Sequence, residues 1–177
     1  EVRSRFGEFG VPVAVYSKTL EDTKVLHDLF HPIDKERFPT VARALTPFSF
    51  VPPREQQLAN QEILKAWQDE LQNVDPKSLP PEHEARWEEA QSYLQAQPFG
   101  FEELPPIFRQ LVTHLPTAKP DNHGYLTYLY PGVDLWDGRL MLAFAEDVET
   151  ISVPNGPEFH AAGLPILFAT LAKIVLE

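Results

Sequence analysis

The stretch Tyr125–Glu177 limits the possible folds more than any other part of the chain. It begins with an aromatic run, YLTYLY, which predicts a strand because aromatic side chains suit the half-buried surface of a sheet. Apolar residues then recur at helical spacing, before a second short strand and a strongly apolar last helix. The expected elements are a strand over 125–130, a helix from Trp136 or Asp137 to about Thr150, a strand over 158–162 and a helix over 164–176. This order predicts a sheet with helices packed against it.

The N-terminal part repeats the order of strand, helix and strand. VPVAVYS at 11–17 predicts a strand, and Thr19 is expected to cap a helix that ends before Pro32. A second strand is expected within 38–45. The two β-α-β parts together predict an α+β fold of the ferredoxin-like split kind, with helices on one face of a small mixed sheet.

A helical insertion separates the two β-α-β parts. Residues 54–97 are rich in Glu, Gln and Ala, and their apolar residues predict two antiparallel helices joined by a Pro-rich turn. A third helix is expected over 101–113. The first of these helices is expected to bury the stripe Leu58, Ile63, Leu64, Trp67 and Leu71, and the second, over 82–97, the residues Trp87, Ala90, Tyr93 and Leu94. In the C-terminal part, the buried helical face is expected to be Leu140, Phe144, Val148 and Ile151.

The net charge of −11 excludes several classes of partner. An acidic surface repels the phosphates of nucleic acids and the heads of anionic lipids, so neither is an expected partner. The chain contains no Cys, which removes disulfides, Cys metal sites and Cys nucleophiles from consideration. No run of 18 apolar residues exists, so the sequence predicts no membrane span within it.

The sequence gives little support for bond chemistry. Neither the GxSxG of serine hydrolases nor a GxGxxG or P-loop pattern occurs, so we expect no enzyme and no cofactor. His27 and His31 have the i, i+4 spacing of zinc-binding histidines, yet no third ligand follows, and a solvated pair without metal is the favoured interpretation. The acidic residues Glu82, Glu84, Glu88 and Glu89 are expected to form a solvated helix face.

Large aromatic residues near Pro-rich junctions are the candidate ligand-binding residues. They either line an apolar groove or fill the core between the insertion and the sheet, and the sequence leaves both possibilities open. The candidates are Phe48, Phe50, Phe99, Phe101, Phe108, Trp67 and Trp87.

Several segments together resemble one family of transport proteins. YLYP, WDGR, LAFAEDVETI and AAGLPILFATLAKIV follow the order of a strand ending in Tyr-Pro, a D-G-R segment opening a helix, and a Gly-x-Pro step before a last helix. Arg5-Phe6-Gly7 with VPVAVYS, and SFVPPREQQLANQEIL, extend the likeness toward the N-terminus. The chain thus resembles the second large periplasmic loop of resistance–nodulation–division (RND) transporters, in the branch of the mycobacterial large membrane proteins and the hopanoid exporters.

The resemblance implies a porter-type domain without catalytic residues. It would divide into a first β-α-β half at 1–53, the helical insertion at 54–120, and a second half at 121–177 that leads into a transmembrane helix. The domain would be periplasmic and belong to a bacterial inner-membrane protein driven by protons. Its implied partners are a hydrophobic lipid of the sterol or hopanoid class, the other periplasmic loop and the transmembrane part of the transporter, and a periplasmic lipid carrier. The alternative is a docking module in which the acidic insertion binds a protein partner and no ligand.

Overall fold

The chain divides into two compact units. The computed structural model describes residues 10–71, 74–75, 80, 83, 86–114, 123–154 and 156–176. One unit, called the sheet unit here, consists of Glu1–Phe50 and Leu104–Glu177, and the other, the helical unit, of Val51–Glu103. The division at 1–53, 54–120 and 121–177 stays a prediction.

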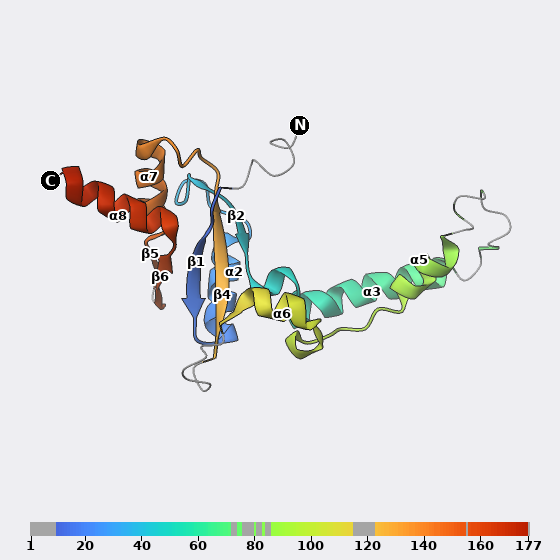
Figure 1. The fold of residues 1–177 in the computed structure, drawn as a ribbon. Coiled ribbons are helices and arrows are strands. Elements are labelled where there is room, and N and C mark those ends of the chain that lie inside the picture. Colours follow the sequence, from blue (N-terminus) through green and yellow to red (C-terminus); the bar gives the residue numbers. More distant parts are fainter. Residues whose placement is uncertain are drawn as a thin grey trace. The chain divides into compact units, whose positions relative to one another are not determined.

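The sheet unit contains both β-α-β parts of the chain (Figure 1). Its elements in chain order are β1 (Val13–Ser17), α2 (Leu20–Phe30), β2 (Val41–Leu45), the 3-10 turn η1 (Pro47–Ser49), α6 (Pro106–Val112), β3 (Thr113–His114), β4 (Gly124–Pro131), α7 (Gly138–Val148), β5 (Thr150–Ser152), β6 (Glu158–Ala162) and α8 (Leu164–Leu176). The strands expected over 11–17, 38–45, 125–130 and 158–162 are therefore present with small shifts at their ends.

The strands form one antiparallel sheet. Their order is β2-β4-β1-β6-β5, and β3 pairs with β4 outside this path. All strand pairs in the described residues are antiparallel, so the fold is α+β as expected but the expectation of a mixed sheet is wrong. The reason is that the two halves interleave. β4 of the second half lies between β1 and β2 of the first, running opposite to both.

A side-chain cap begins each of the two helices α2 and α7, and the cap of α2 is the Thr19 that the sequence predicts. Thr19 Oγ1 accepts a hydrogen bond from the backbone N–H of Asp22 at 3.0 Å, at the start of α2. Asp137 accepts one from the N–H of Arg139 at 2.9 Å, at the start of α7. Each cap satisfies a backbone donor that has no partner within its helix.

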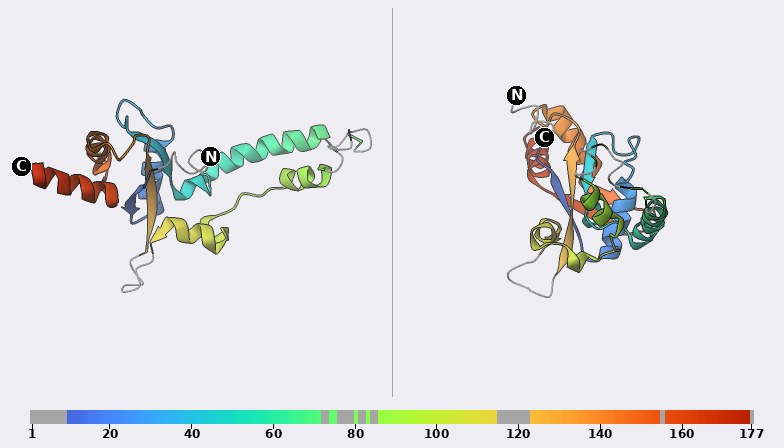
Figure 2. Two further views of the ribbon diagram at one scale, coloured as in Figure 1. Left: turned by 45° about the horizontal axis from the view of Figure 1, so that its top comes forward. Right: turned by 90° about the vertical axis from the view of Figure 1, so that its right-hand side faces the viewer.

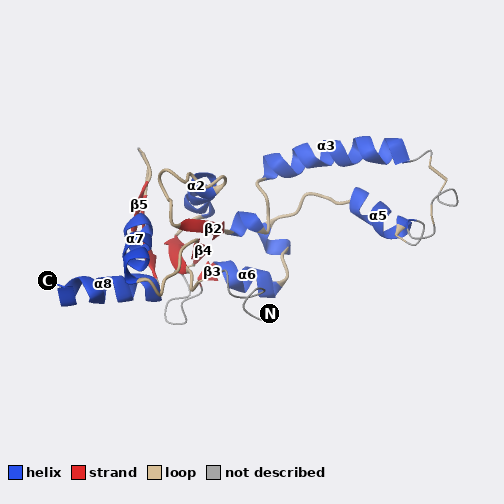
Figure 3. Cartoon of the chain, turned by 90° about the horizontal axis from the view of Figure 1, so that it is seen from above, coloured by secondary structure: helices blue, strands red, loops and turns tan. Residues whose placement is uncertain are grey.

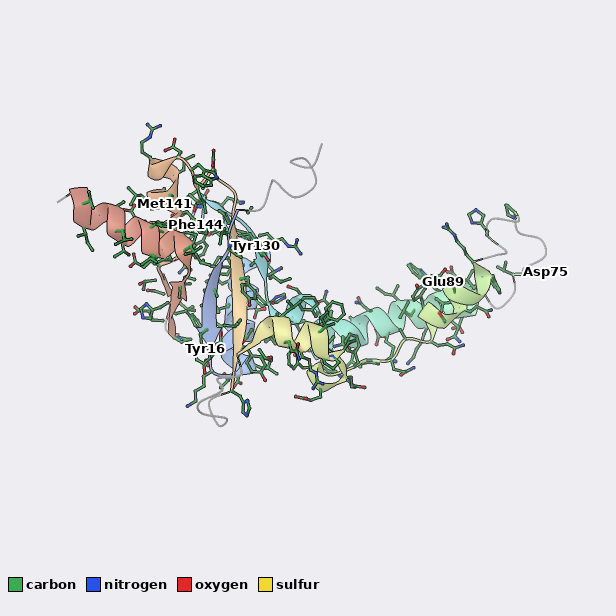
Figure 4. All side chains as sticks on the ribbon, in the orientation of Figure 1. Tyr16, Asp75, Glu89, Tyr130, Met141 and Phe144 are labelled. Atoms are coloured by element: carbon green, nitrogen blue, oxygen red, sulfur yellow. The ribbon has the colours of Figure 1, made fainter. Side chains whose placement is uncertain are left out.

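One face of the sheet and the helices α2 and α7 enclose the core. Alternate residues of β1, Val13 and Val15, are completely buried against Leu26 and Phe30 of α2 and Phe144 of α7. Figure 4 labels Phe144 on its helix. The expected buried positions Val148 and Ile151 also lie in this core, although Ile151 belongs to β5.

Leu140 was expected on the same buried face, and this is wrong. It is 38% exposed, because it lies in the first turn of α7, before the part of the helix that covers the sheet.

The elements with described bounds in the helical unit are two helices, which lie side by side, and a short turn (Figure 3). They are α3 (Arg54–Leu71), α5 (Trp87–Leu94) and the 3-10 turn η3 (Phe101–Glu103). Part of the second expected helix, over 82–97, falls on residues 82, 84 and 85, which lie outside the described residues.

The third expected helix, over 101–113, is wrong as a single element. It is divided into η3 and α6 because a residue before proline is driven away from helical conformation, and Leu104 precedes Pro105. Pro106 then occupies the first turn of α6, where its missing N–H has no consequence.

The stripe expected to be buried on α3 is also largely wrong. Leu58, Ile63 and Trp67 are about half exposed, at 47%, 52% and 55%. The half-buried positions of α3 lie on a different face, at i, i+4, i+7, i+11 and i+14, and three of these five residues are glutamines. They are Gln57, Gln61, Leu64, Gln68 and Leu71. On α5, Trp87 and Leu94 are half-buried as expected, whereas Ala90 and Tyr93 are exposed.

Candidate functional site

The structure brings two of the seven candidate aromatic residues into direct contact. The ring centroids of Phe50, just after η1, and Phe108 on α6 lie 5.5 Å apart at a tilt of 42°. These residues are 58 positions apart in the sequence, so the contact is a product of the fold. Its geometry is that of a favourable aromatic pair.

The Phe50–Phe108 pair belongs to a larger apolar surface on α6, which we call the α6 patch. It consists of Phe50, Ile107, Phe108 and Leu111. Ile107 is 66% exposed, Leu111 48% and Phe108 41%, whereas Val112 on the same helix is completely buried. The short helix α6 thus inserts Val112 into the protein and leaves its other large apolar residues in contact with solvent. Phe50 and Phe108 are predicted site residues, whereas Ile107 and Leu111, which complete the patch, are not among the residues predicted from the sequence.

A third candidate, Phe48, lies beside a histidine pair on α2. The rings of His27 and His31 stack at 4.2 Å and 19°, and the ring of Phe48 lies 5.5 Å from that of His27. Nδ1 of His27 is 2.9 Å from Oγ1 of the buried Thr46, and Nδ1 of His31 is 3.1 Å from the carbonyl oxygen of His27. Stacked parallel rings cannot both direct a lone pair at one metal ion in their planes. The arrangement is therefore that of a packing contact between α2 and η1.

Burial lowers the pKa of His27 below its usual 6.5, and the neighbouring His31 lowers it further. Asp28 raises the pKa and Lys24 lowers it, with smaller effects, and these two side chains also pair with each other at 2.7 Å. The neutral form of His27 is consequently the one that fits the folded chain.

The lowered pKa predicts that the sheet unit loses stability in mild acid. As the pH falls, His27 takes up a proton in the unfolded chain at a higher pH than in the folded chain. The contribution of neutral His27 to the free energy of unfolding is therefore fully present above about pH 6.5 and is lost as the pH falls through the folded-state pKa. Urea denaturation at about pH 7.5 and about pH 5 should show a smaller loss of unfolding free energy for His27→Gln than for the wild type. An identical loss in both proteins would assign the acid sensitivity to other groups.

The four remaining candidates belong to the helical unit. Trp67 is 55% and Phe99 36% exposed, whereas Trp87 and Phe101 are half-buried. Gln57 fixes the backbone at Phe99 from both sides, because its amide nitrogen donates to the Phe99 carbonyl and its amide oxygen accepts from the Phe99 N–H. These contacts hold the chain after α5 against α3.

Of the four acidic residues at positions 82, 84, 88 and 89, the structure describes the side chain of Glu89 only. Glu89 is exposed and accepts a hydrogen bond from the hydroxyl of Tyr93 at 2.9 Å. Glu82 and Glu84, and the side chain of Glu88, lie outside the described residues. The expectation that this run is a solvated face therefore remains a prediction for those three positions.

A second large apolar surface lies on α8. Six of its residues, at i, i+3, i+4, i+7, i+10 and i+11, form one stripe, which we call the α8 stripe. Their exposed fractions range from 49% to 83%. They are Leu164, Leu167, Phe168, Leu171, Ile174 and Val175. The sequence predicts this helix but does not indicate which of its sides is exposed.

The opposite side of α8 packs on the sheet unit. Pro165 and Ala169 are buried there, and the helix contacts α7, β1 and β6 before it extends away from the sheet (Figure 2). Gly163 makes the preceding turn with φ +158°, a conformation open almost only to glycine. A Cβ at this position would lie 3.2 Å from Cα of Val13 in β1.

The described part of the chain lacks two further features, a metal-binding cluster and a membrane-crossing helix. No group of three or more His, Asp, Glu or Cys residues there is placed to hold a metal ion. None of the helices described combines the length and apolar character that a membrane crossing needs. Comparison with known proteins finds no family model, no curated protein and no solved structure that matches this chain.

Proposed function

We propose that the chain is a periplasmic domain of a proton-driven RND-type transporter and that it binds or passes a hydrophobic lipid, with sterols and hopanoids as the favoured class. The observation that carries this proposal is the apolar surface left open on the sheet unit, in the α6 patch and the α8 stripe. Large contiguous apolar patches are rare on proteins that face only water, and they mark contacts with lipids, ligands or other proteins. The domain would perform no bond chemistry and need no cofactor.

The positions of the family-like segments support the transporter assignment. YLYP ends at Pro131, the last residue of β4, and the D-G-R segment opens α7 with Asp137 as its cap. The Gly-x-Pro step falls at Gly163 and Pro165, where α8 begins. Each segment therefore coincides with the element boundary that the resemblance requires.

The strand order supports the finer fold assignment, a ferredoxin-like split β-α-β unit. Two interleaved β-α-β halves place their four main strands in the order β2-β4-β1-β6, with a helix of each half on the same face. In this assignment β3 and β5 are short additions to the unit. The helical unit is the insertion between the halves.

The two apolar surfaces would have different roles. The α6 patch, with its aromatic pair, is the proposed lipid-binding surface, because flat rings offer a large contact area to a polycyclic lipid. The α8 stripe would contact acyl chains or the transmembrane part of the same protein. The other periplasmic loop and a periplasmic lipid carrier are the further proposed partners.

Equilibrium titration with a fluorescent sterol tests this function. We expect saturable binding by the wild type and a roughly threefold to tenfold weaker affinity for Phe108→Ser, since complete burial of a Phe side chain contributes about 1.5–3 kcal/mol and only the exposed 41% of Phe108 is left to be buried by the lipid. Leu58→Ser is the matched control, because Leu58 is similarly exposed but lies in the helical unit. Absence of saturable binding of both the sterol and a hopanoid, or equal affinities of the two variants, would contradict the proposal.

A further inference from the structure

Within the described residues of the helical unit, helix α3 makes its packing contacts through one face, and it also carries exposed apolar residues outside that face. The inner face, from Gln57 to Leu71, turns toward α5 and the chain that follows it. Gln57 bonds to the backbone of Phe99, and Nε2 of Gln61 donates to Oε1 of Gln97 at 3.0 Å. No residue of α3 is buried, so even this face remains loosely covered.

The outer face presents Ile63 and Trp67 to solvent. They lie one helical turn apart and are 52% and 55% exposed, so they form a single ridge. Tryptophan is one of the residues enriched at the energetic centre of protein interfaces. An exposed Trp–Ile ridge on a helix that already has a packing face is typical of a surface that docks into a recess.

The charge of the helical unit defines the kind of partner. Residues 51–103 contain 11 of the 26 acidic residues of the chain but only four of its 15 basic residues. Glu62 and Glu70, close to the ridge in the sequence, are both exposed. A second copy of this surface, a nucleic acid or an anionic lipid head would be repelled, whereas a surface rich in Lys and Arg would be attracted.

We propose that the Ile63–Trp67 ridge is a docking surface for a protein partner that has an apolar recess rimmed by basic side chains. Trp67 fills the recess, and the carboxylates of Glu62 and Glu70 pair with the rim. The surface lies in the helical unit and is independent of the α6 patch, so this inference stands or falls separately from the proposed lipid function.

The test uses the full chain and two fluorescently labelled helical peptides of identical length, one built from Leu and Lys and one from Leu and Glu. Fluorescence anisotropy should show saturable binding of the Leu/Lys peptide that weakens with added salt, and no binding of the Leu/Glu peptide. Trp67→Ser and Ile63→Ser should each weaken the binding, with about a tenfold loss for Trp67→Ser. Leu58→Ser, on the other side of α3, should retain the wild-type affinity.

Three results would overturn the docking surface. The first is failure of the Leu/Lys peptide to bind, and the second is equal binding of both peptides. The third is equal affinity of Trp67→Ser and Leu58→Ser for the Leu/Lys peptide, which would mean that net charge alone causes the binding. Circular dichroism of each variant establishes that α3 keeps its helix. Since all three substituted residues are about half exposed, none should unfold the helical unit.

Discussion

Replacing Phe144 with alanine should lower the free energy of unfolding of the sheet unit by about 3–5 kcal/mol. Phe144 is completely buried and is one of the two largest side chains at the centre of the core. From α7 it packs in the same cluster as residues of α2 and of the sheet. Its removal would therefore leave a cavity where α2, α7 and the sheet meet. The expected loss in the free energy of unfolding is a large fraction of the stability of a typical domain.

Phe168→Ala is the matched control for this prediction. It removes the same side chain from α8, where Phe168 is 53% exposed, and should change the unfolding free energy by no more than about 0.5 kcal/mol. Urea denaturation followed by circular dichroism measures both variants. Similar losses in the two proteins would mean that the core is not organised around α7 as described.

Replacing Leu167, Phe168 and Leu171 together with serine should abolish most of the affinity of the chain for lipid vesicles. These three residues lie at the centre of the α8 stripe, and each contributes roughly 1–2 kcal/mol if its exposed part enters an apolar phase. The expected loss is about 100-fold or more. Zwitterionic phosphatidylcholine vesicles are the suitable probe, because the net charge of −11 opposes binding to anionic ones.

Vesicle co-sedimentation measures this effect, with the triple variant Leu58→Ser, Ile63→Ser and Tyr93→Ser as control. These three residues are also about half exposed or more, but they lie in the helical unit. The control should partition like the wild type. If it loses as much affinity as the α8 variant, partitioning reflects total exposed apolar area and not a membrane-facing helix.

Much of the sheet unit can be read from local sequence. Thr19 and Asp137 mark the starts of α2 and α7, because a cap depends only on residues two or three positions away. The aromatic run of β4 is equally local. By contrast, β3 and β5 are only two and three residues long, too short for any periodic pattern, and they exist because β4 and β6 offer them a partner.

The orientation of α3 shows what local sequence leaves open. Apolar periodicity favours a buried face with Ile63 and Trp67, yet the helix turns its glutamines inward. Gln57 and Gln61 form hydrogen bonds with residues 42 and 36 positions away. The apolar pattern of a single helical segment cannot predict contacts with residues so far along the chain.

The candidate site shows the same limit. The sequence identifies Phe50 and Phe108 as large aromatics near prolines, but only the fold places them side by side. Ile107 and Leu111 belong to the same patch. Their exposure cannot be predicted from the sequence, because an apolar residue in a short helix gives the same sequence pattern whether it is exposed or buried. The division of residues 101–113 at Pro105 had a signal that was available, since proline constrains the residue before it.

Photo-crosslinking with a diazirine-labelled sterol, followed by peptide mapping, tests whether the α6 patch binds a lipid. The proposed function predicts saturable labelling at Phe50 and within residues 107–111, which an excess of unlabelled sterol suppresses and Phe108→Ser reduces. Labelling that is spread over both units, or that unlabelled sterol fails to suppress, would contradict a lipid-binding role for the α6 patch.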